Sequence, residues 1–322
     1  MKEYIQRALL EHSDGYVTGS ALCKKFGVTR AAVWKVMEEL RTEGWQIEAV
    51  SGKGYRLKNE TAAALSKVLI EVRLEHSMWN RIMLLDKVDS TNTYLKRLAE
   101  DGAEEGTAVI ALRQTQGRGR RGRNWASNPG GIYLSFLFQP QPAIPLEQVP
   151  VMSLAVAMAA YKAILQVANV QTGIKWPNDV IYKGRKMCGI LSELCGGVDT
   201  GIYCVAGIGI NVEKSVIPEE LQEHAVSLEE ITGTILDKNE LAAQMLKEME
   251  WEYRNLDTCV QRYAEICVTV GKEVSVIGAA EEFKGTAIGV SDGGGLIVRK
   301  EDGTETVVSS GEVSVRGIYG YV

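Results

Sequence analysis

Apolar residues recur at helical spacing in the first part of the chain and predict a cluster of three short helices. Ser20 and Thr29 are residue types that cap helix N-termini, and Gly27 between them supplies a sharp turn. Two helices joined by a short turn of this kind form a helix-turn-helix. The three helices are expected over residues 2–11, 21–26 and 30–44.

After the third helix, residues 46–50 and 54–57 are expected to be two strands around a glycine turn. They complete a winged helix-turn-helix over residues 1–60. Such a fold either binds DNA or serves only for protein contact, and both interpretations stay open here. In the first case, side chains off the apolar stripe face a groove and the wing approaches phosphates. These candidates are Arg30, Trp34, Lys35 and Arg41 on the helix, and Lys53 and Arg56 on the wing.

The middle of the chain alternates strand-like apolar runs with helical stretches, which predicts an α/β or α+β domain. Strands are expected at 81–88, 107–112, 132–138, 186–194 and 203–210, and helices at 90–101, 147–168 and 239–256. From residue 273 onward, short strands punctuated by glycine predict a small β-barrel. The expected organisation is a multidomain α+β chain divided into residues 1–60, 65–268 and 270–322.

Composition favours a globular cytoplasmic protein. The chain has 322 residues, 45% of them hydrophobic, and no apolar run is expected to approach the roughly 20 residues of a membrane span. The six cysteines form no CxxC pair, so neither a zinc site nor a disulfide framework is expected. Residues 1–60 hold ten Lys and Arg against eight Asp and Glu, a charge of +2, whereas the total is −5 and the remainder is therefore −7. This asymmetry suggests that only the N-terminal end meets a polyanion.

Residues 117–125 read GRGRRGRNW and narrow the chemistry more than any other stretch. Glycines let the backbone approach a ligand, and guanidinium groups suit carboxylate and phosphate oxygens. The glycines also satisfy GxGxxG, but a dinucleotide fingerprint needs a helix directly after them, and residues 132–138 read as another strand. We therefore expect an anion clamp on a loop, with a solvated basic loop as the alternative.

Four other segments carry polar groups in dense patterns. Residues 89–92, DSTN, either cap a helix or offer hydroxyls to a ligand, and residues 175–179, KWPND, combine a cation, an indole, an amide and a carboxylate. Lys186 precedes an apolar strand as either a surface lysine or a ligand contact. Residues 207–211, GIGIN, end a strand on an amide. None of the three histidines lies near these motifs in sequence, so histidine acid–base catalysis is not expected.

Cations and amides without an evident nucleophile point to group transfer between bound anions. Two unit charges ~4 Å apart repel by about 4 kcal/mol at an effective dielectric constant of 20. A carboxylate therefore approaches a nucleotide α-phosphate only if cations neutralise that repulsion. This inventory fits adenylate formation.

These motifs occur in the order GRGRRGR with Asn-Trp, KWPND, RKMCGILSE and GIGINV, behind a wing that reads SGKGYRL. In this the chain resembles the bifunctional biotin–protein ligases and biotin-operon repressors over essentially its full length. The resemblance implies a central mixed-sheet ligase domain like that of class II synthetases and a C-terminal Src-homology-3-like barrel. It also implies that biotin and Mg-ATP form biotinyl-5′-adenylate, and that biotin then passes to a lysine of a carboxyl carrier protein.

The resemblance also assigns site residues. Biotin would contact Ser90, Thr91, Gln114, Gly117, Arg118, Gly119, Arg120 and Lys186. The nucleotide would contact Arg120, Arg123, Trp125, Asn178 and Asn211. Arg118, Lys186 and Asp179 would be catalytic, with no metal site built from protein side chains. Residues 212–228 do not align with the family's adenylate-covering loop, and no site is assigned there.

Biotin, ATP and Mg²⁺ are the expected substrates and cofactors. The expected partners are the carrier protein, operator DNA and a second copy of the chain in a ligand-promoted homodimer, with no membrane. Two alternatives remain: a lipoate-type ligase, whose relatives generally lack the helix-turn-helix and the arginine-glycine loop, and a metabolite-sensing repressor without ligase activity. A labelled-biotin transfer assay separates them.

Overall fold

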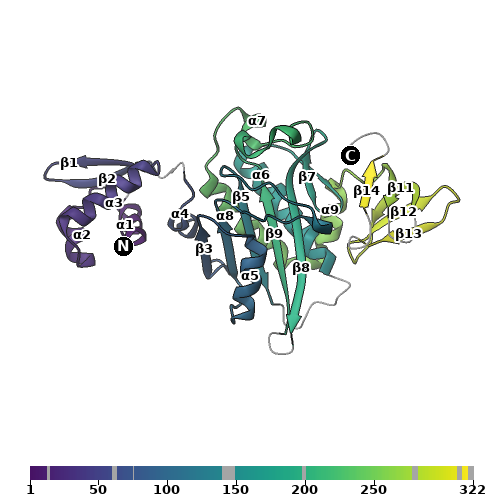
Figure 1. Ribbon diagram of the computed structural model, residues 1–322, viewed down its shortest axis with the longest axis horizontal. Coiled ribbons are helices and arrows are strands. Elements are labelled where there is room, and N and C mark those ends of the chain that lie inside the picture. The colour runs from purple at the N-terminus through teal and green to yellow at the C-terminus, as the bar shows by residue number, and fades with distance from the viewer. Residues whose placement is uncertain are drawn as a thin grey trace. The chain divides into compact units, whose positions relative to one another are not determined.

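The structure is a computed structural model that describes residues 1–12, 15–59, 64–74, 76–139, 149–197, 201–277, 282–309 and 314–317. The chain divides into two compact units. The first contains Met1–Glu75 and Asp237–Ala243, and the second contains His76–Leu236 and Gln244–Val322. Figure 1 labels the elements of both. The central and C-terminal segments thus share one compact unit, and the boundaries expected at residues 60 and 270 stay predictions.

The first unit has the helix-turn-helix and the wing expected from the sequence. Its apolar stripe buries Val33, Val36, Met37 and Leu40 against the other helices and the wing. Val17 also bridges to Tyr55 of the wing by a backbone pair. The elements are α1 (Lys2–Glu11), α2 (Gly19–Phe26), α3 (Arg30–Thr42), β1 (Gln46–Val50), β2 (Gly54–Asn59) and α4 (Lys67–Val72).

The N-cap predicted for the third helix is confirmed, and the one predicted for the second helix is not. The Thr29 hydroxyl accepts the Ala32 N–H at 3.2 Å, as expected. The expectation that Ser20 caps the second helix was wrong, because α2 already begins at Gly19 and Thr18 accepts the Ala21 N–H at 3.1 Å. Serine and threonine both cap helices, so the sequence does not decide between Thr18 and Ser20. The residue at which the helix begins decides it. Gly27 ends α2 at φ 66°, a left-handed conformation that suits glycine.

The second unit is built on a seven-stranded mixed sheet, ordered β3-β4-β5-β9-β8-β7-β6. The β3–β4 pair is parallel and the other pairs are antiparallel. The expected mixed-sheet domain is thereby confirmed. The strands are β3 (Arg81–Leu85), β4 (Thr107–Ala111), β5 (Ile132–Phe138), β6 (Gly173–Lys175), β7 (Asp179–Tyr182), β8 (Arg185–Gly197) and β9 (Gly201–Ile210). The sequence did not predict β6 and β7, which are only three and four residues long.

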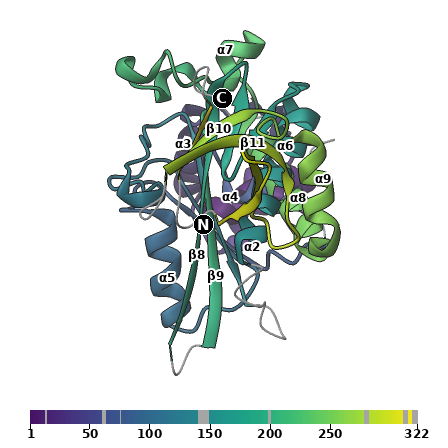
Figure 2. The same cartoon turned by 90° about the vertical axis from the view of Figure 1, so that its right-hand side faces the viewer.

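Helices cover both faces of this sheet (Figure 2). Side chains alternate across β5, so Leu137 packs with α5 (Thr91–Glu100) on one face. On the opposite face Phe138 stacks against Tyr253 of α8 (Lys238–Arg254), with ring centroids 4.5 Å apart. The remaining helices are α6 (Val149–Ala168), α7 (Leu228–Thr232) and α9 (Cys259–Ile266). The expected start of a helix at residue 147 lies outside the described residues.

Helix α6 corrects one expectation. Its segment Pro150–Ala168 is long and apolar enough, by length and composition, to cross a membrane, although no such run was expected. Most of this segment is buried inside the protein, with Val156, Ala160 and Ile164 fully inaccessible. A helix that is apolar all round is also what the core of a large domain requires. We therefore assign α6 to the core.

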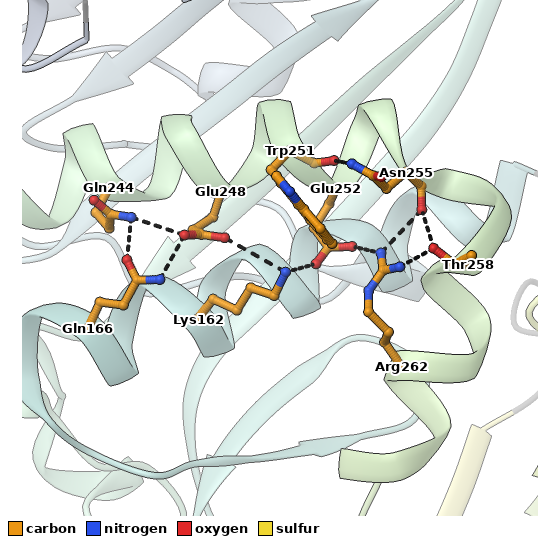
Figure 3. Close-up of polar contacts among 9 residues, drawn as sticks. All are labelled: Lys162, Gln166, Gln244, Glu248, Trp251, Glu252, Asn255, Thr258 and Arg262. Atoms are coloured by element: carbon orange, nitrogen blue, oxygen red, sulfur yellow. Dashed lines mark hydrogen bonds and ion pairs between the residues drawn. The ribbon is translucent and has the colours of Figure 1, made fainter.

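A polar network holds α6, α8 and α9 together (Figure 3). The Glu252 carboxylate is fully buried and pairs with Lys162 at 2.8 Å and with Arg262 at 2.5 Å. The Trp251 ring lies between the same two cations. Because each helix contributes one member of the triad, the network fixes the helical layer on its face of the sheet.

The C-terminal segment forms a five-stranded, all-antiparallel sheet ordered β13-β12-β11-β10-β14. Its strands are β10 (Glu273–Ile277), β11 (Glu282–Val290), β12 (Leu296–Lys300), β13 (Glu305–Val308) and β14 (Ser314–Gly317). This agrees with the short glycine-punctuated strands expected there. The Trp176 indole N–H donates to the Gly294 carbonyl at 3.0 Å and so links the sheet to the β6–β7 turn.

Candidate active site

One cavity of about 660 Å³ in the second unit gathers almost every predicted ligand contact. Its size suits a small molecule. Five groups of residues bring polar side chains to it: the start of α5, the loop after β4, the β6–β7 turn, and strands β8 and β9. The predicted contacts that line it are Ser90, Thr91, Gln114, Arg118, Gly119, Arg120, Arg123, Trp125, Asn178, Asp179, Lys186 and Asn211.

Gly117 is the one predicted ligand contact that does not line the cavity. A Cβ at this position would meet the Ser127 hydroxyl at 2.5 Å and the Gln114 amide nitrogen at 3.2 Å. The Trp125 N–H also donates to the Gly117 carbonyl at 2.9 Å. Because glycine has no Cβ, Gly117 can pack closely against Gln114 and Ser127 of the same loop.

The start of α5 shows whether the hydroxyls of residues 89–92 are needed to cap the helix. Ser90 is the N-cap, but its side chain makes no capping hydrogen bond. Instead the Gln114 side-chain oxygen accepts the Thr91 N–H at 2.8 Å. Because Gln114 of the loop after β4 satisfies this N–H, Ser90 and Thr91 line the cavity without their hydroxyls being needed as caps.

The cations of the site have different surroundings. Lys186 pairs with Asp179 at 2.6 Å and lies 5.2 Å from the centre of a Trp125 ring. Arg120 donates to the Asn178 side-chain oxygen at 3.1 Å, and burial lowers the pKa of its guanidinium. Arg118 and Arg123 line the cavity with exposed side chains. Of the four predicted cations, two are thus anchored and two are exposed on a loop, and Arg121 and Lys175 line the cavity as well.

Two paired glycines form the floor under Trp125. Gly189 of β8 and Gly209 of β9 are opposite each other in the sheet. A Cβ at Gly189 would meet the indole at 2.7 Å, and one at Gly209 would come closer still. The indole N–H is buried and has no hydrogen-bond partner among the residues that the structure describes. Glycine at both positions therefore lets the indole lie directly on the sheet.

The KWPND segment is the turn between β6 and β7. Lys175, Asn178 and Asp179 line the cavity. The Trp176 side chain is buried, its backbone N–H donates to the Thr269 hydroxyl at 3.0 Å, and its indole bonds to Gly294. The turn therefore offers the cavity its charged and amide groups, while its indole anchors the C-terminal sheet.

The segment after β9, to which no site was assigned, also lines the cavity. It folds back beside Lys186, whose N–H donates to the His224 carbonyl at 2.8 Å, and the Val226 N–H donates to the Lys186 carbonyl at 3.0 Å. The Asn211 side-chain nitrogen donates to the Lys186 carbonyl and to the Val226 carbonyl, each at 3.5 Å. The lining residues of this segment are Val216, Ile217, Pro218, Leu221, His224 and Ala225.

The expectation that no histidine lies near the motifs was therefore wrong in space, since His224 lines the cavity. It is distant from the motifs in sequence, and only the return of the chain beside β8 brings it close. The isolated apolar pair Val216 and Ile217 was the sequence signal for this covering segment. Both side chains are buried and pack against Tyr133, with Trp125 beside them.

Within the described ranges, no three His, Cys, Asp or Glu side chains gather in an arrangement that could hold a metal ion. Asp179 is the only carboxylate that lines the cavity there, and it is paired with Lys186.

The first unit presents the predicted DNA contacts on two elements. On α3, Arg30, Trp34 and Lys35 are exposed. Arg41 donates to the Ile47 carbonyl at 3.0 Å, so it ties the helix to the wing. On the wing, Arg56 donates to the Glu48 carboxylate at 2.8 Å.

A tyrosine lies beside the wing cations. The Arg56 guanidinium and the Lys53 ammonium lie 4.9 and 5.8 Å from the centre of the Tyr16 ring. The Tyr16 hydroxyl in turn donates to Glu48 at 2.9 Å. Glu48 thus neutralises part of the positive charge of the wing.

Comparisons with known proteins match all three parts of the chain. The Biotin/lipoate A/B protein ligase family matches residues 84–211, an HTH domain matches residues 2–56, and the Biotin protein ligase C terminal domain matches residues 269–316. The first match contains the cavity-lining segments up to the end of β9.

Curated relatives are similar over nearly the whole length. The Bifunctional ligase/repressor BirA of Bacillus spizizenii is 34% identical over 96% of this chain and 98% of its own. The protein of the same name from Escherichia coli is 32% identical over 96% of this chain and 95% of its own. Among solved structures, the biotin protein ligase from Aquifex aeolicus in complex with biotin and ATP is 34% identical, with a TM-score of 0.64. The match covers 74% of this chain and 99% of the chain of that structure.

Proposed function

The chain belongs to the biotin protein ligases, in the bifunctional form that carries a helix-turn-helix repressor domain, and on that premise we propose how its cavity works. Biotin and ATP bind together in the cavity and form biotinyl-5′-adenylate. Pyrophosphate leaves in this step. The adenylate then passes its biotin to a lysine of a carboxyl carrier protein, and AMP leaves. The observation that carries this proposal is that one cavity is lined both by neutral hydroxyl and amide groups and by four cations of the predicted set.

The two kinds of lining match the two substrates. Biotin has a neutral ureido group, which suits Ser90 and Thr91 at the start of α5 and Gln114 in the loop after β4. Its carboxylate must meet a triphosphate, and like charges repel strongly where water is excluded. Lys186 and the arginines of residues 117–125 would neutralise that repulsion and stabilise the negative charge that develops on the transferring phosphoryl group.

The arginine-glycine loop would also protect the adenylate. A mixed anhydride hydrolyses if water reaches it, so a loop that orders over it acts as a lid. Trp125 and the apolar pair Val216 and Ile217 already border the cavity on that side. We assign adenine stacking to Trp125 and the phosphates to Arg120 and Arg123.

Asp179 has a role in each step. It pairs with Lys186 at 2.6 Å. When Lys186 shares its charge with the biotin carboxylate and the α-phosphate, the Asp179 carboxylate is released. An acceptor lysine has a pKa of about 10.4 in water, so a neighbouring carboxylate would help to orient or deprotonate it.

Mg²⁺ would enter as the complex with ATP. A magnesium ion commonly binds through one or two carboxylates together with substrate phosphates. The single carboxylate of the lining fits that pattern better than a metal site built from protein alone. The metal would then supply charge to the triphosphate, while the residues named above bind and orient the two organic substrates.

The first unit would bind operator DNA through α3 and the wing. We also propose that the adenylate promotes a homodimer, because two winged modules together match a two-fold operator. A cytoplasmic location agrees with this set of partners. Arg30, Trp34 and Lys35 would face the groove, and Lys53 and Arg56 would approach phosphates.

Incubation with labelled biotin, ATP and a carrier protein tests the ligase directly. We expect label on the carrier only when ATP is present, and little label when lipoate replaces biotin. A matched carrier whose acceptor lysine is replaced by arginine controls for nonspecific labelling. Absence of label on the intact carrier would leave a biotin sensor without ligase activity, and preferential use of lipoate would favour a lipoate-type ligase.

A further inference from the structure

A chain of buried polar groups runs behind the cavity. Ser135 lies in the middle of β5 and is fully buried, and it does not line the cavity. Its hydroxyl oxygen lies 2.7 Å from the Thr91 hydroxyl oxygen and 2.6 Å from the Asn92 side-chain oxygen. Thr91 and Asn92 do line the cavity. Ser135 therefore touches two lining residues from behind.

The far end of this chain fixes the orientation of the Asn92 amide. The Asn92 amide nitrogen donates to the Leu191 carbonyl at 3.0 Å and to the Glu193 carboxylate at 2.9 Å. Both partners can only accept hydrogen bonds. Lys96 pairs with Glu193 at 2.6 Å and keeps that carboxylate in place. The Asn92 oxygen must consequently point toward Ser135.

The direction of the hydroxyl protons follows from this orientation. An amide oxygen only accepts, so the single Ser135 proton goes to Asn92. The Ser135 oxygen can then only accept, and its partner is the Thr91 hydroxyl. Thr91 therefore donates its one proton to Ser135, and its two lone pairs remain available to accept a hydrogen bond.

At the cavity end of this series of polar groups, two oxygen atoms lie close together with no proton between them. The Gln114 oxygen accepts the Thr91 N–H at 2.8 Å, and the Gln114 nitrogen donates to the Ser127 hydroxyl at 2.8 Å, which fixes the Gln114 amide. The Thr91 hydroxyl oxygen lies 3.1 Å from the Gln114 oxygen. With the Thr91 proton directed to Ser135, these are two acceptors side by side. A donor that enters the cavity, such as an N–H group of a ligand, completes the arrangement.

We propose that Ser135 is a positioning residue that, with Glu193 behind it, turns the Thr91 hydroxyl away from Gln114, so that Thr91 and Gln114 together accept an N–H group of the ligand. The inference rests on the proposed function, in which biotin supplies a ureido N–H. It explains why a serine occupies the centre of a buried apolar strand. It also explains the glycine at position 207, where a Cβ would collide with the Asn92 side chain.

The substitution Ser135→Ala tests the proposal. Without Ser135 the Thr91 proton can turn to Gln114, and the two acceptors satisfy each other. We expect biotin to bind roughly 3- to 10-fold more weakly, the worth of about one neutral hydrogen bond. In adenylate formation, KM for biotin should rise by a similar factor while kcat changes less than about twofold.

A selectivity measurement separates positioning from a general structural role. Binding of biotin is compared by calorimetry with binding of biotin N-methylated at each ureido nitrogen in turn. The wild type should discriminate strongly at one nitrogen, and Ser135→Ala should lose most of that discrimination. Equal weakening of biotin and both analogues would overturn the proposal, and so would unchanged binding of biotin.

Ser192→Ala is the matched control, because its hydroxyl is also buried in the sheet and has no hydrogen-bond partner among the described residues. It should bind biotin like the wild type. A wild-type protein that neither binds biotin nor forms adenylate would instead refute the proposed function, and this inference with it.

Ser135→Cys carries the test if Ser135→Ala does not fold. A thiol fits nearly the same space but is only a weak acceptor, so the Thr91 proton turns toward Gln114. We expect the same loss of discrimination between biotin and its methylated analogues. Ser192→Cys is its control, since the Ser192 hydroxyl has no hydrogen-bond partner among the described residues. Wild-type discrimination in Ser135→Cys would overturn the proposal.

Discussion

At the scale of single residues, the site depends on positions where a side chain is excluded as much as on those where one is required. Gly189 and Gly209 face each other across β8 and β9, and the Trp125 indole lies on both. In the sequence, residues 207–211 showed only a strand that ends on an amide. The structure shows close approach of an indole from the same chain.

We predict that Gly209→Ala displaces the indole without unfolding the protein. The added methyl group collides with the Trp125 ring, which belongs to a loop and can move. Affinity for biotin with ATP should fall roughly 10-fold, a loss of about 1.4 kcal/mol. Calorimetric titration measures this, with Gly289→Ala as the control because its methyl group would meet Ile297 at an ordinary 3.7 Å. Wild-type affinity in Gly209→Ala would contradict the arrangement.

Asp89 should make stability depend on pH. Its hydrogen bonds to Arg97 lower the pKa of this carboxyl below the ordinary value. A lowered pKa in the folded state means that the stabilisation is fully present above the unfolded value of about 3.9 and is lost as the pH falls through the folded value. Because the pair is largely exposed, we expect about 0.5 kcal/mol.

Thermal unfolding of Asp89→Asn measures this effect. The variant should be less stable than the wild type at neutral pH, and the difference should shrink below the unfolded value of about 3.9 and disappear once the pH is below the lowered pKa of Asp89 in the folded state. The exposed Asp86, changed to asparagine, controls for the lost charge. A difference that persists at low pH would show that the ion pair is not its cause.

At the scale of elements, the wing carries its own counter-ion. Glu48 of β1 holds Arg56 of β2 at 2.8 Å and lies 3.7 Å from Lys58. An element that approaches DNA must give up such a pair before its arginine reaches a phosphate. The wing geometry therefore favours moderate affinity for nonspecific DNA.

We predict that Glu48→Gln strengthens binding to a duplex of random sequence and that Lys53→Ala weakens it. Each change alters the number of phosphate charges neutralised, so the slope of log K against log salt should shift by about 1, in opposite directions. Fluorescence anisotropy over a salt series gives both slopes. Glu11→Gln is the control, since Glu11 pairs with Lys25 away from the wing. Slopes equal to the wild type would remove the wing from the DNA interface.

The Glu252 network should contribute strongly to the stability of the helical layer. Glu252→Ala leaves Lys162 and Arg262 without their shared buried partner. Both cations keep some solvent exposure, so we expect a loss of about 2 kcal/mol rather than the larger cost of fully buried charges. Urea denaturation measures it, with the exposed Glu219→Ala as control. A loss equal to that of the control would show that the network contributes nothing.

At the scale of the whole molecule, ligand binding and DNA binding belong to different compact units of the chain. Coupling between ligand binding and DNA binding requires that the protein has two states, and that the small-molecule ligand and the DNA each bind one of these states more tightly than the other. Ordering of residues 117–125 over an adenylate would change the protein surface around the cavity. A dimer that forms only on this surface would connect the two activities.

We predict that biotin with ATP shifts the protein from monomer to dimer. Sedimentation velocity with both ligands, with each alone and with neither should show the larger species only when adenylate forms. Arg118→Ala should weaken the shift, because that side chain is an exposed member of the loop. Identical distributions in all conditions would exclude ligand-promoted dimerisation.

Much of this organisation could be predicted from local pattern. Helical spacing located α1 and α3, and two short strands around a glycine turn located the wing. The motif-bearing residues were predicted because arginine, glycine and amide groups have distinctive chemistry at short spacing. The short strands β6 and β7 were not predicted, since runs of three and four residues carry too little periodicity.

The sequence by itself determined the identity of the domains and the chemistry of the site, because periodicity and residue type act locally along the chain. Tertiary structure alone decided which residues meet: His224 beside Lys186, Trp125 on two glycines, and Ser135 behind Thr91. Their spacing in the chain predicts none of these contacts. Each depends on which strands become neighbours and which face a side chain occupies, and burial of the whole core sets both.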